Sequence, residues 1–123
     1  NKGALDGADA SVERRNPLCG DEIGLQLALD GDVVRDVRFT GRGCSISQAS
    51  ASMLTQALRG RTRAEAEALL ARFTRLVHGD AEAARDAALA ELRALQGVAR
   101  FPARIRCATL AWSALEEALR ATA

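Results

Sequence analysis

The segment Thr40-Gly41-Arg42-Gly43-Cys44-Ser45-Ile46-Ser47-Gln48-Ala49-Ser50 joins an alternating stretch to a run of small residues. This pattern predicts a strand, a tight glycine turn and then a helix opened by Ser45 or Ser47, with Cys44 at the junction. The two glycines leave room for a bulky group beside the main chain. The first N–H groups of a helix favour negative charge, and therefore the thiolate form that binds metals and attacks sulfur. The segment indicates a metal or sulfur-handling site, while a small buried structural cysteine remains an open alternative.

The residues before this turn predict a small antiparallel sheet. Apolar residues at 23, 25, 27 and 29 alternate with polar or small ones, and residues 33–40 alternate again after the Asp30-Gly31-Asp32 turn. A period of two is typical of half-buried strands, so the two runs predict a hairpin. Residues 10–14 alternate more weakly and predict a short edge strand beside it.

The residues after the turn have helical spacing. Residues 46–58 predict a helix that stops at Gly60. A capping box, Thr62-Arg63-Ala64-Glu65, begins a second helix, because threonine and glutamate satisfy each other's backbone donors. Asp80 is expected to cap a third helix, in which leucines recur every three residues at 89, 92 and 95.

The C-terminal part of the chain is expected to end in one further helix. Residues 98–106 predict a connection interrupted by proline, because proline removes a backbone donor. The last helix is then expected to start near Cys107, with Trp112 at the margin of its buried stripe.

Composition limits the possible functions. The chain has 123 residues and 48% apolar content, enough for one domain with one modest core. Lys+Arg 17 against Asp+Glu 16, with no tyrosine, argues against the basic field and stacking platforms of a nucleic-acid binder. No apolar run approaches the ~20 residues of a membrane helix. Three widely spaced cysteines do not resemble a secreted disulfide framework, so a reducing cytoplasm is expected.

Four side chains are candidate metal ligands. Cys19 and Asp21 point the same way if the segment between them is extended, and Cys44 and Cys107 are each expected at a helix start. Three thiolates and one carboxylate would make the tetrahedral shell that zinc prefers. Iron or an iron–sulfur cluster is also compatible with soft thiolates. The spacing is not that of a zinc finger, and the alternative is separate buried cysteines with a solvated aspartate.

Other polar residues suggest supporting roles. The single histidine, His78, is expected to cap a helix end or lie on the surface. The serines at 45, 47, 50 and 52 are expected to serve as caps and close helix packing, because one histidine without an orienting partner does not make a nucleophile site. Arg100, Arg104 and Arg106 lie beside Cys107 in the chain, where positive charge stabilises a thiolate or receives an acidic partner.

Three cysteine segments resemble the U-type iron–sulfur cluster assembly family, which includes IscU and the N-terminal domain of NifU, and most closely its SufU branch. They are residues 16–21 (NPLCGD), 41–50 (GRGCSISQAS) and 101–112 (FPARIRCATLAW). The likeness covers essentially the whole chain. It implies an α+β fold, with a small antiparallel three-stranded sheet and helices packed on one side. It also implies a single domain over residues 1–123, preceded in the family by an N-terminal helix that this sequence lacks.

Two departures favour the SufU branch. Arg106 stands where IscU-like members have a histidine before the third cysteine, and residues 60–76 resemble an insertion of SufU-like members. The resemblance therefore implies a zinc-dependent sulfurtransferase rather than a scaffold for a transient [2Fe–2S] cluster. Its zinc ligands would be Cys19, Asp21, Cys44 and Cys107.

The resemblance also implies a partner and a role for each residue. The sulfur donor would be a SufS-type, pyridoxal-phosphate cysteine desulfurase, of which this chain would be an acceptor partner rather than a stand-alone enzyme. Cys19, expected on a loop, would be displaced from zinc by a ligand of the desulfurase and would accept the sulfur. Arg104 would serve docking or thiolate stabilisation. A downstream cluster-assembly complex is a further candidate partner, whereas neither nucleic acid nor membrane is expected. A cluster scaffold and a purely structural zinc remain the alternatives.

Overall fold

The computed structural model describes residues 7–16 and 20–122, apart from the side chains of residues 87, 88 and 90. Its sheet is antiparallel, with strands in the order β1-β2-β3. The predicted three-stranded sheet is confirmed, and each strand is longer than its alternation indicated. The strands are β1 (Ala10–Asn16), β2 (Asp21–Asp30) and β3 (Val33–Arg42).

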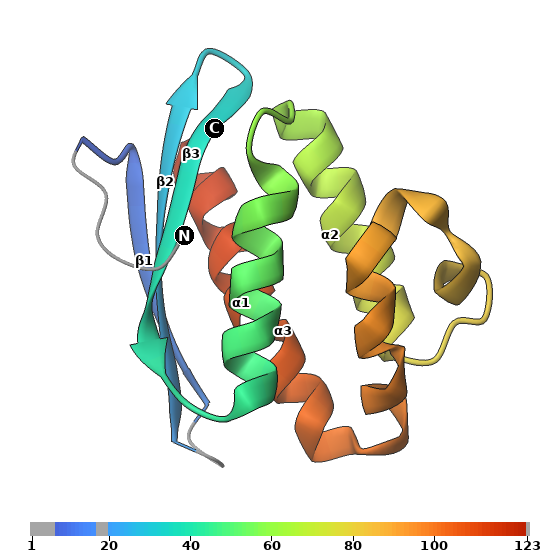
Figure 1. The fold of residues 1–123 in the computed structure, drawn as a ribbon. Helices are drawn as coiled ribbons and strands as arrows, with labels where there is room; N and C mark the ends of the chain where they lie inside the picture. Colours follow the sequence, from blue (N-terminus) through green and yellow to red (C-terminus); the bar gives the residue numbers. More distant parts are fainter. Residues whose placement is uncertain (1–6, 17–19, 123) are drawn as a thin grey trace.

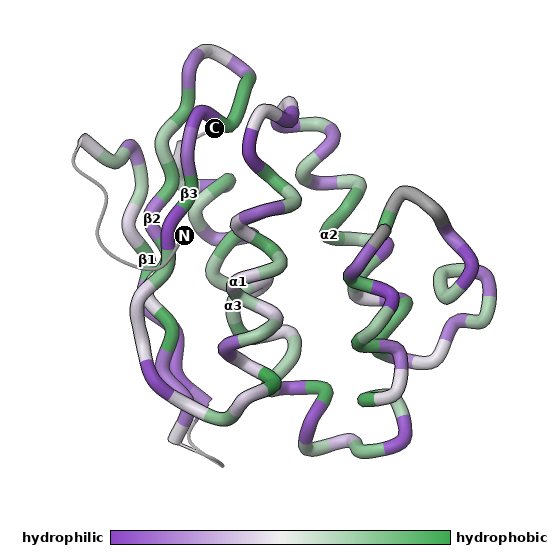
Figure 2. Tube along the Cα trace, viewed as in Figure 1, coloured by the Kyte–Doolittle hydropathy of each residue, from purple (hydrophilic) through white to green (hydrophobic). Residues whose placement is uncertain are grey.

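The register of the sheet brings Asp21 and the end of β3, which leads to Cys44, to the same end of the sheet. Asn16 pairs with Asp21 where β1 and β2 meet, and Glu22 pairs with Arg42 at the end of β3. The tip of the β2–β3 hairpin, at Gly31, lies at the opposite end. In Figure 2, hydrophobic and hydrophilic residues alternate along β2 and β3, as half-buried strands require. The apolar members face the helices and are almost fully buried, including Ile23, Leu25 and Leu27.

Helices cover one face of the sheet, as the sequence predicts (Figure 1). α1 and α3 pack on the strands, while α2 packs against α3 and η2 further from the sheet. Among the described residues, no helix is both long enough and apolar enough to cross a membrane. The helices are α1 (Ser45–Leu58), α2 (Arg63–Val77), η1 (Ala83–Arg85), η2 (Ala87–Arg100) and α3 (Pro102–Ala121).

The last helix begins earlier than predicted. Phe101 is its N-cap and Pro102 its first residue, so the prediction of a connection over 98–106 is wrong. Proline suits the first helical position, because its fixed φ is helical and the N–H that it lacks would have had no partner there. Cys107 therefore lies in the second turn of α3, and not at a helix start.

The leucine repeat lies in a helix, as expected, and the structure shows that this helix is of the 3₁₀ kind. Leu89, Leu92 and Leu95 are buried as expected, and they belong to the 3₁₀ helix η2, whose three residues per turn match their spacing. Asp80 does not cap η2. Its Oδ1 accepts a hydrogen bond from the Glu82 backbone (3.0 Å), and the separate turn η1 lies between it and η2.

The centre of the core is an aromatic pair, which sequence reasoning misplaced. Trp112 is 1% exposed rather than marginal, and its ring stacks on Phe73 with the centroids 4.4 Å apart. Because α3 packs against the sheet, α1, α2 and η2, it buries more than one stripe of its surface. Trp112 Nε1 donates to Ser50 Oγ (3.0 Å), and that hydroxyl donates to the Ala108 carbonyl (2.5 Å). The two helices that carry Cys44 and Cys107 are thus joined by buried hydrogen bonds.

Asp36 joins β3 to the end of α1 and gives a pH prediction. Burial raises the pKa of Asp36, but hydrogen bonds from Arg59, the Val37 backbone N–H and Arg38 outweigh it, so the pKa lies below the ordinary 3.8. A lowered folded-state pKa contributes stability above the unfolded value, and this contribution is lost as the pH falls through the folded value. We expect Asp36→Asn to destabilise the fold at pH 7, and this effect to shrink as the pH falls below 3.8. Urea unfolding at a series of pH values tests this, and an effect that stays the same at every pH would contradict it.

Candidate metal centre

Three of the four predicted ligands come together. A carboxylate oxygen of Asp21 and the Sγ atoms of Cys44 and Cys107 all lie within 4.8 Å of one another. We call these three residues the thiol–carboxylate cluster. Cys19, the fourth predicted ligand, lies outside the described residues. Asp21, Cys44 and Cys107 come from β2, the entrance to α1 and α3, so the tertiary fold brings them together.

Asp21 is the buried anchor of the cluster. Asp21 is the first residue of β2 and is 1% exposed. Oδ1 accepts a hydrogen bond from the Cys44 backbone N–H (2.9 Å), and Oδ2 lies 3.5 Å from Cys44 Sγ. One oxygen thus fixes the start of α1, while the other faces the thiol. A buried carboxylate needs such partners, because removal from water strongly disfavours its charge.

The glycine turn makes this approach possible. A Cβ on Gly43 would lie 2.4 Å from Asp21 Oδ1 and 2.7 Å from Ser47 Oγ, and a Cβ on Gly41 would lie 2.0 Å from the Glu22 carbonyl oxygen. The prediction that the glycines leave room beside the main chain is confirmed, and the groups that occupy this space are the carboxylate and the neighbouring strand.

Cys44 is itself the N-cap of α1, with Ser45 as the first helical residue. Its backbone is extended, its side chain makes no capping hydrogen bond, and the residue is partly exposed. Ser47 Oγ donates to the Cys44 carbonyl (3.0 Å) and lies 3.9 Å from Cys44 Sγ. The thiol therefore stands at the positive end of the helix dipole and remains accessible from outside.

Cys107 is held more deeply than Cys44. The residue is 4% exposed, and its Sγ lies 3.7 Å from the Ala103 carbonyl one turn earlier. Arg104, predicted to dock a partner, lies in the first turn of α3 and is exposed. It has no ion pair within the part of the chain that the structure describes. Arg104 is therefore near Cys107 along the helix, with its charge available to another molecule.

The donor set fits zinc. At the usual zinc–sulfur and zinc–oxygen bond lengths, the ligand atoms of a tetrahedral site are about 3.6–3.8 Å apart. The distance of 3.5 Å from Cys44 Sγ to Asp21 Oδ2 is close to this range. The other ligand atoms of the cluster are at most 4.8 Å apart, so movements of about 1 Å would bring them to the distances of a zinc site. Two soft sulfur donors disfavour magnesium and calcium, and they also suit iron.

Other predicted polar residues fall outside the cluster, while one that sequence reasoning missed lies near it. His78 is the C-cap of α2, as predicted, and its exposed Nδ1 is 2.7 Å from the Thr74 carbonyl oxygen. Ser50 serves helix packing, also as predicted. Gln48 follows Cys44 by one helical turn, and its buried Nε2 has no hydrogen-bond partner among the described residues. The sequence signal that could have pointed to Gln48 is its position four residues after Cys44, which places the two on the same face of a helix.

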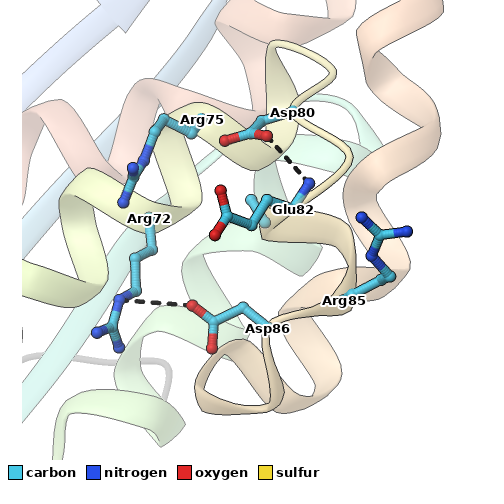
Figure 3. A pocket seen from close by; sticks show the side chains of 7 residues that line it. Arg72, Arg75, Asp80, Glu82, Arg85 and Asp86 are labelled. Atoms are coloured by element: carbon cyan, nitrogen blue, oxygen red, sulfur yellow. Dashed lines mark hydrogen bonds and ion pairs between the residues drawn. The ribbon is translucent and has the colours of Figure 1, made fainter.

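Away from the cluster, a cavity of about 420 Å³ is lined by charged groups and contains no thiol (Figure 3). Arg72 forms an ion pair with Asp86 there (3.5 Å), and Asp80 accepts a hydrogen bond from the Glu82 backbone. Arginines and acidic residues are balanced on its walls, so it presents no single charge to a ligand. The thiol–carboxylate cluster, in contrast, combines burial with metal-binding donor atoms.

The fold and the cluster define a class: small α+β domains that hold sulfur and oxygen donors between one sheet end and two helices. A family model described as "NifU-like N terminal domain" matches residues 1–108. The chain belongs to this family, as its cysteine segments indicated. The family is that of iron–sulfur cluster assembly proteins of the IscU and NifU type.

Individual relatives agree with this assignment. The chain is 49% identical to the zinc-dependent sulfurtransferase SufU of Bacillus subtilis, over 95% of this chain and 78% of that protein. It is 47% identical to the iron–sulfur cluster assembly scaffold protein IscU of Streptococcus pyogenes, over 98% and 75%. The crystal structure of a candidate SUF-system scaffold protein from Fervidobacterium islandicum superposes with a TM-score of 0.89 at 34% identity, covering 96% of this chain and 85% of that one.

Proposed function

We propose that this protein is a zinc-dependent sulfur acceptor in iron–sulfur cluster biogenesis. It takes persulfide sulfur from a cysteine desulfurase onto a thiol of the site formed by Cys19, Asp21, Cys44 and Cys107. The observation that carries the proposal is the convergence of Asp21, Cys44 and Cys107 within 4.8 Å. The similarity to a relative named a zinc-dependent sulfurtransferase supports it. The protein would act in the cytoplasm, where a reducing environment keeps such thiols free.

The described ligands would hold the ion from rigid elements. Asp21 is fixed by the Cys44 backbone, Cys44 by the start of α1, and Cys107 by the second turn of α3. Bound zinc would supply Lewis acidity that keeps the thiols in their thiolate form. Cys19 lies between β1 and β2, two residues from Asp21 in the chain, and is our choice for the fourth ligand and sulfur acceptor.

The sulfur transfer is a thiol exchange. The Cys19 thiolate attacks the outer sulfur of the desulfurase persulfide, and a new S–S bond forms on Cys19. The S–S bond of the donor breaks, and its cysteine leaves as a thiolate with the electron pair. The hydrogen of the persulfide stays on the transferred sulfur, so no external oxidant or reductant is consumed. Arg104 would contribute a positive charge for docking the donor or stabilising a thiolate.

Mass spectrometry of the loaded protein tests the acceptor assignment. Cleavage after arginine separates the three cysteines into peptides 16–35, 43–59 and 107–120. After incubation of the zinc-loaded protein with a cysteine desulfurase and cysteine, we expect one extra sulfur on peptide 16–35. Cys19→Ser should abolish that signal and the onward transfer of sulfur.

Two results would contradict this assignment. Unmodified peptide 16–35 with undiminished transfer would exclude Cys19 as the acceptor. If circular dichroism shows that every ligand variant loses its folded structure to the same extent as it loses sulfur transfer, a purely structural zinc would be favoured instead.

A scaffold for a transient [2Fe–2S] cluster is the second candidate function. The 47% identical relative named a scaffold protein favours it, as does the compatibility of thiolates with iron. Anaerobic reconstitution with iron and sulfide, followed by transfer to an apo-ferredoxin, separates the two functions. A cluster that does not form, or cannot be passed on, would exclude the scaffold role.

A further inference from the structure

Gln48 has a buried amide nitrogen that the fold leaves without an acceptor. The residue as a whole is partly exposed, but its Nε2 is buried. Within the part of the chain that the structure describes, it is the one buried side-chain nitrogen or oxygen that makes no hydrogen bond. Burying an N–H donor without a partner costs stability, and native proteins rarely leave one. Such a donor is expected where a bound ion or ligand brings the missing acceptor into reach.

The position of Gln48 on α1 directs attention to Cys44. The Gln48 backbone N–H donates to the Cys44 carbonyl oxygen (3.2 Å), so the two residues lie one turn apart on the same face of the helix. The Cβ atoms of residues at this spacing are about 5–6 Å apart, and helical side chains lean toward the N-terminus of the helix. A glutamine side chain spans this distance. The Gln48 amide can therefore reach the thiol at the start of α1.

The sulfur of Cys44 becomes a strong acceptor only in the metal-bound form of the site. In the structure, the thiol lies 3.5 Å from Asp21 Oδ2, and that carboxylate can accept its hydrogen. A metal-bound cysteine is a thiolate, which has no hydrogen to donate and accepts charge-assisted hydrogen bonds. The nearby Ser47 hydroxyl already donates to the Cys44 carbonyl (3.0 Å). Gln48 is thus the side chain on this face of α1 with a donor to spare.

We propose that Gln48 is a positioning residue of the metal site, whose Nε2 donates a hydrogen bond to the Cys44 thiolate when zinc is bound. The inference rests on the proposed function, which assigns zinc to this site. The amide favours the zinc-bound form in two ways: it gains a partner there, and it lacks one in the metal-free protein. A hydrogen bond to a ligand atom also fixes the orientation of that ligand. Gln48 would therefore hold Cys44 in place as a ligand.

Gln48→Met tests the inference, because methionine has a similar length and helix propensity but no N–H donor. We expect the zinc affinity to fall about tenfold, measured by competition against a coloured chelator. The urea midpoint of the metal-free protein should stay equal or rise, because the variant no longer buries an unpaired donor. Gln56→Met makes the same change at an exposed position of α1. It is the matched control and should leave both quantities unchanged.

Cobalt(II) in place of zinc gives the hydrogen bond a spectroscopic signature. A hydrogen bond to a metal-bound thiolate lowers the energy of the sulfur lone pairs, so the sulfur-to-cobalt charge-transfer band moves to shorter wavelength. The band of Gln48→Met should therefore lie at longer wavelength than that of the wild type, while Gln56→Met should match the wild type. A loss of packing alone would not shift the band in this direction.

Gln48→Glu tests the alternative that the side-chain oxygen of Gln48 coordinates the metal. The variant removes the donor and offers a carboxylate, which is a better metal ligand than an amide oxygen. Zinc binding should weaken in Gln48→Glu if the amide donates to the thiolate. Tighter zinc binding would overturn the inference in favour of direct coordination.

The outcomes also separate this inference from the proposed function. If the wild type binds zinc weakly and its cobalt form shows no sulfur charge-transfer band, the proposed function fails and this inference fails with it. If the wild type binds both metals through its thiols, but Gln48→Met keeps its zinc affinity within about twofold and its cobalt band unshifted, only the inference on Gln48 is overturned. A parallel loss of zinc affinity and metal-free stability in Gln48→Met would also overturn it, because it would assign Gln48 to packing.

Discussion

Gly43→Ala is expected to lower zinc affinity by about 10–100-fold while leaving the fold intact. The added Cβ would lie 2.4 Å from Asp21 Oδ1 and 2.6 Å from its Cγ, closer than nonbonded atoms approach. Asp21 is almost fully buried and cannot swing into water, so the carboxylate and the start of α1 must separate. That movement breaks the hydrogen bond from the Cys44 backbone and carries the thiol away from the carboxylate.

Gly97→Ala is the matched control, because nothing lies within 4 Å of the position of its Cβ. Competition against a coloured zinc chelator measures the affinity of each variant, and circular dichroism reports whether it is folded. Wild-type affinity in Gly43→Ala would show that the close approach of Asp21 is not needed for metal binding. An equal loss in Gly97→Ala would point to a general effect of replacing glycine.

Trp112→Ala is expected to reduce the free energy of unfolding by about 3–5 kcal/mol. The indole is buried, stacks on Phe73 of α2, and donates to Ser50 of α1. Its removal leaves a cavity in the centre of the core and breaks one link between α1 and α3. Zinc affinity should therefore fall as well, because those helices position Cys44 and Cys107.

Trp112→Phe separates packing from hydrogen bonding. It keeps an aromatic ring beside Phe73 but removes the Nε1–H donor, so a smaller loss of about 1–3 kcal/mol is expected. Phe101→Ala, at an exposed aromatic position, should change stability little. Urea unfolding of the metal-free and zinc-loaded forms measures all three. A Trp112→Ala variant as stable as Phe101→Ala would contradict the central place of this side chain.

Local pattern predicts the sheet and much of the site because both are marked by short-range signals. The alternation around Leu25, the capping box at Thr62 and the glycines around Cys44 each have one favourable local structure. The convergence of Asp21, Cys44 and Cys107 could not follow from their spacing alone, because it depends on how α3 packs. It was expected through the family resemblance, and in the structure these three side chains do lie together.

The errors concern the C-terminal half, where local signals conflict with tertiary packing. Pro102 looks like an interruption in the chain, but it is favourable as the first residue of a helix. Trp112 lies at the edge of a single apolar stripe, but α3 is covered on several sides. The three-residue repeat of leucines is compatible with both α and 3₁₀ helices, and only the structure distinguishes them.

The hydrogen bond from the Cys44 backbone to Asp21 provides a natural probe for amide exchange measurements. Amide protons at the entrance to a helix have no intrahelical acceptor and ordinarily exchange quickly with solvent. At Cys44 a buried carboxylate is that acceptor, so the amide should exchange only when the carboxylate moves away. Hydrogen–deuterium exchange at this one amide would therefore report how often the site opens. The measurement needs no signal from the metal, which suits zinc because it is a closed-shell ion without colour of its own.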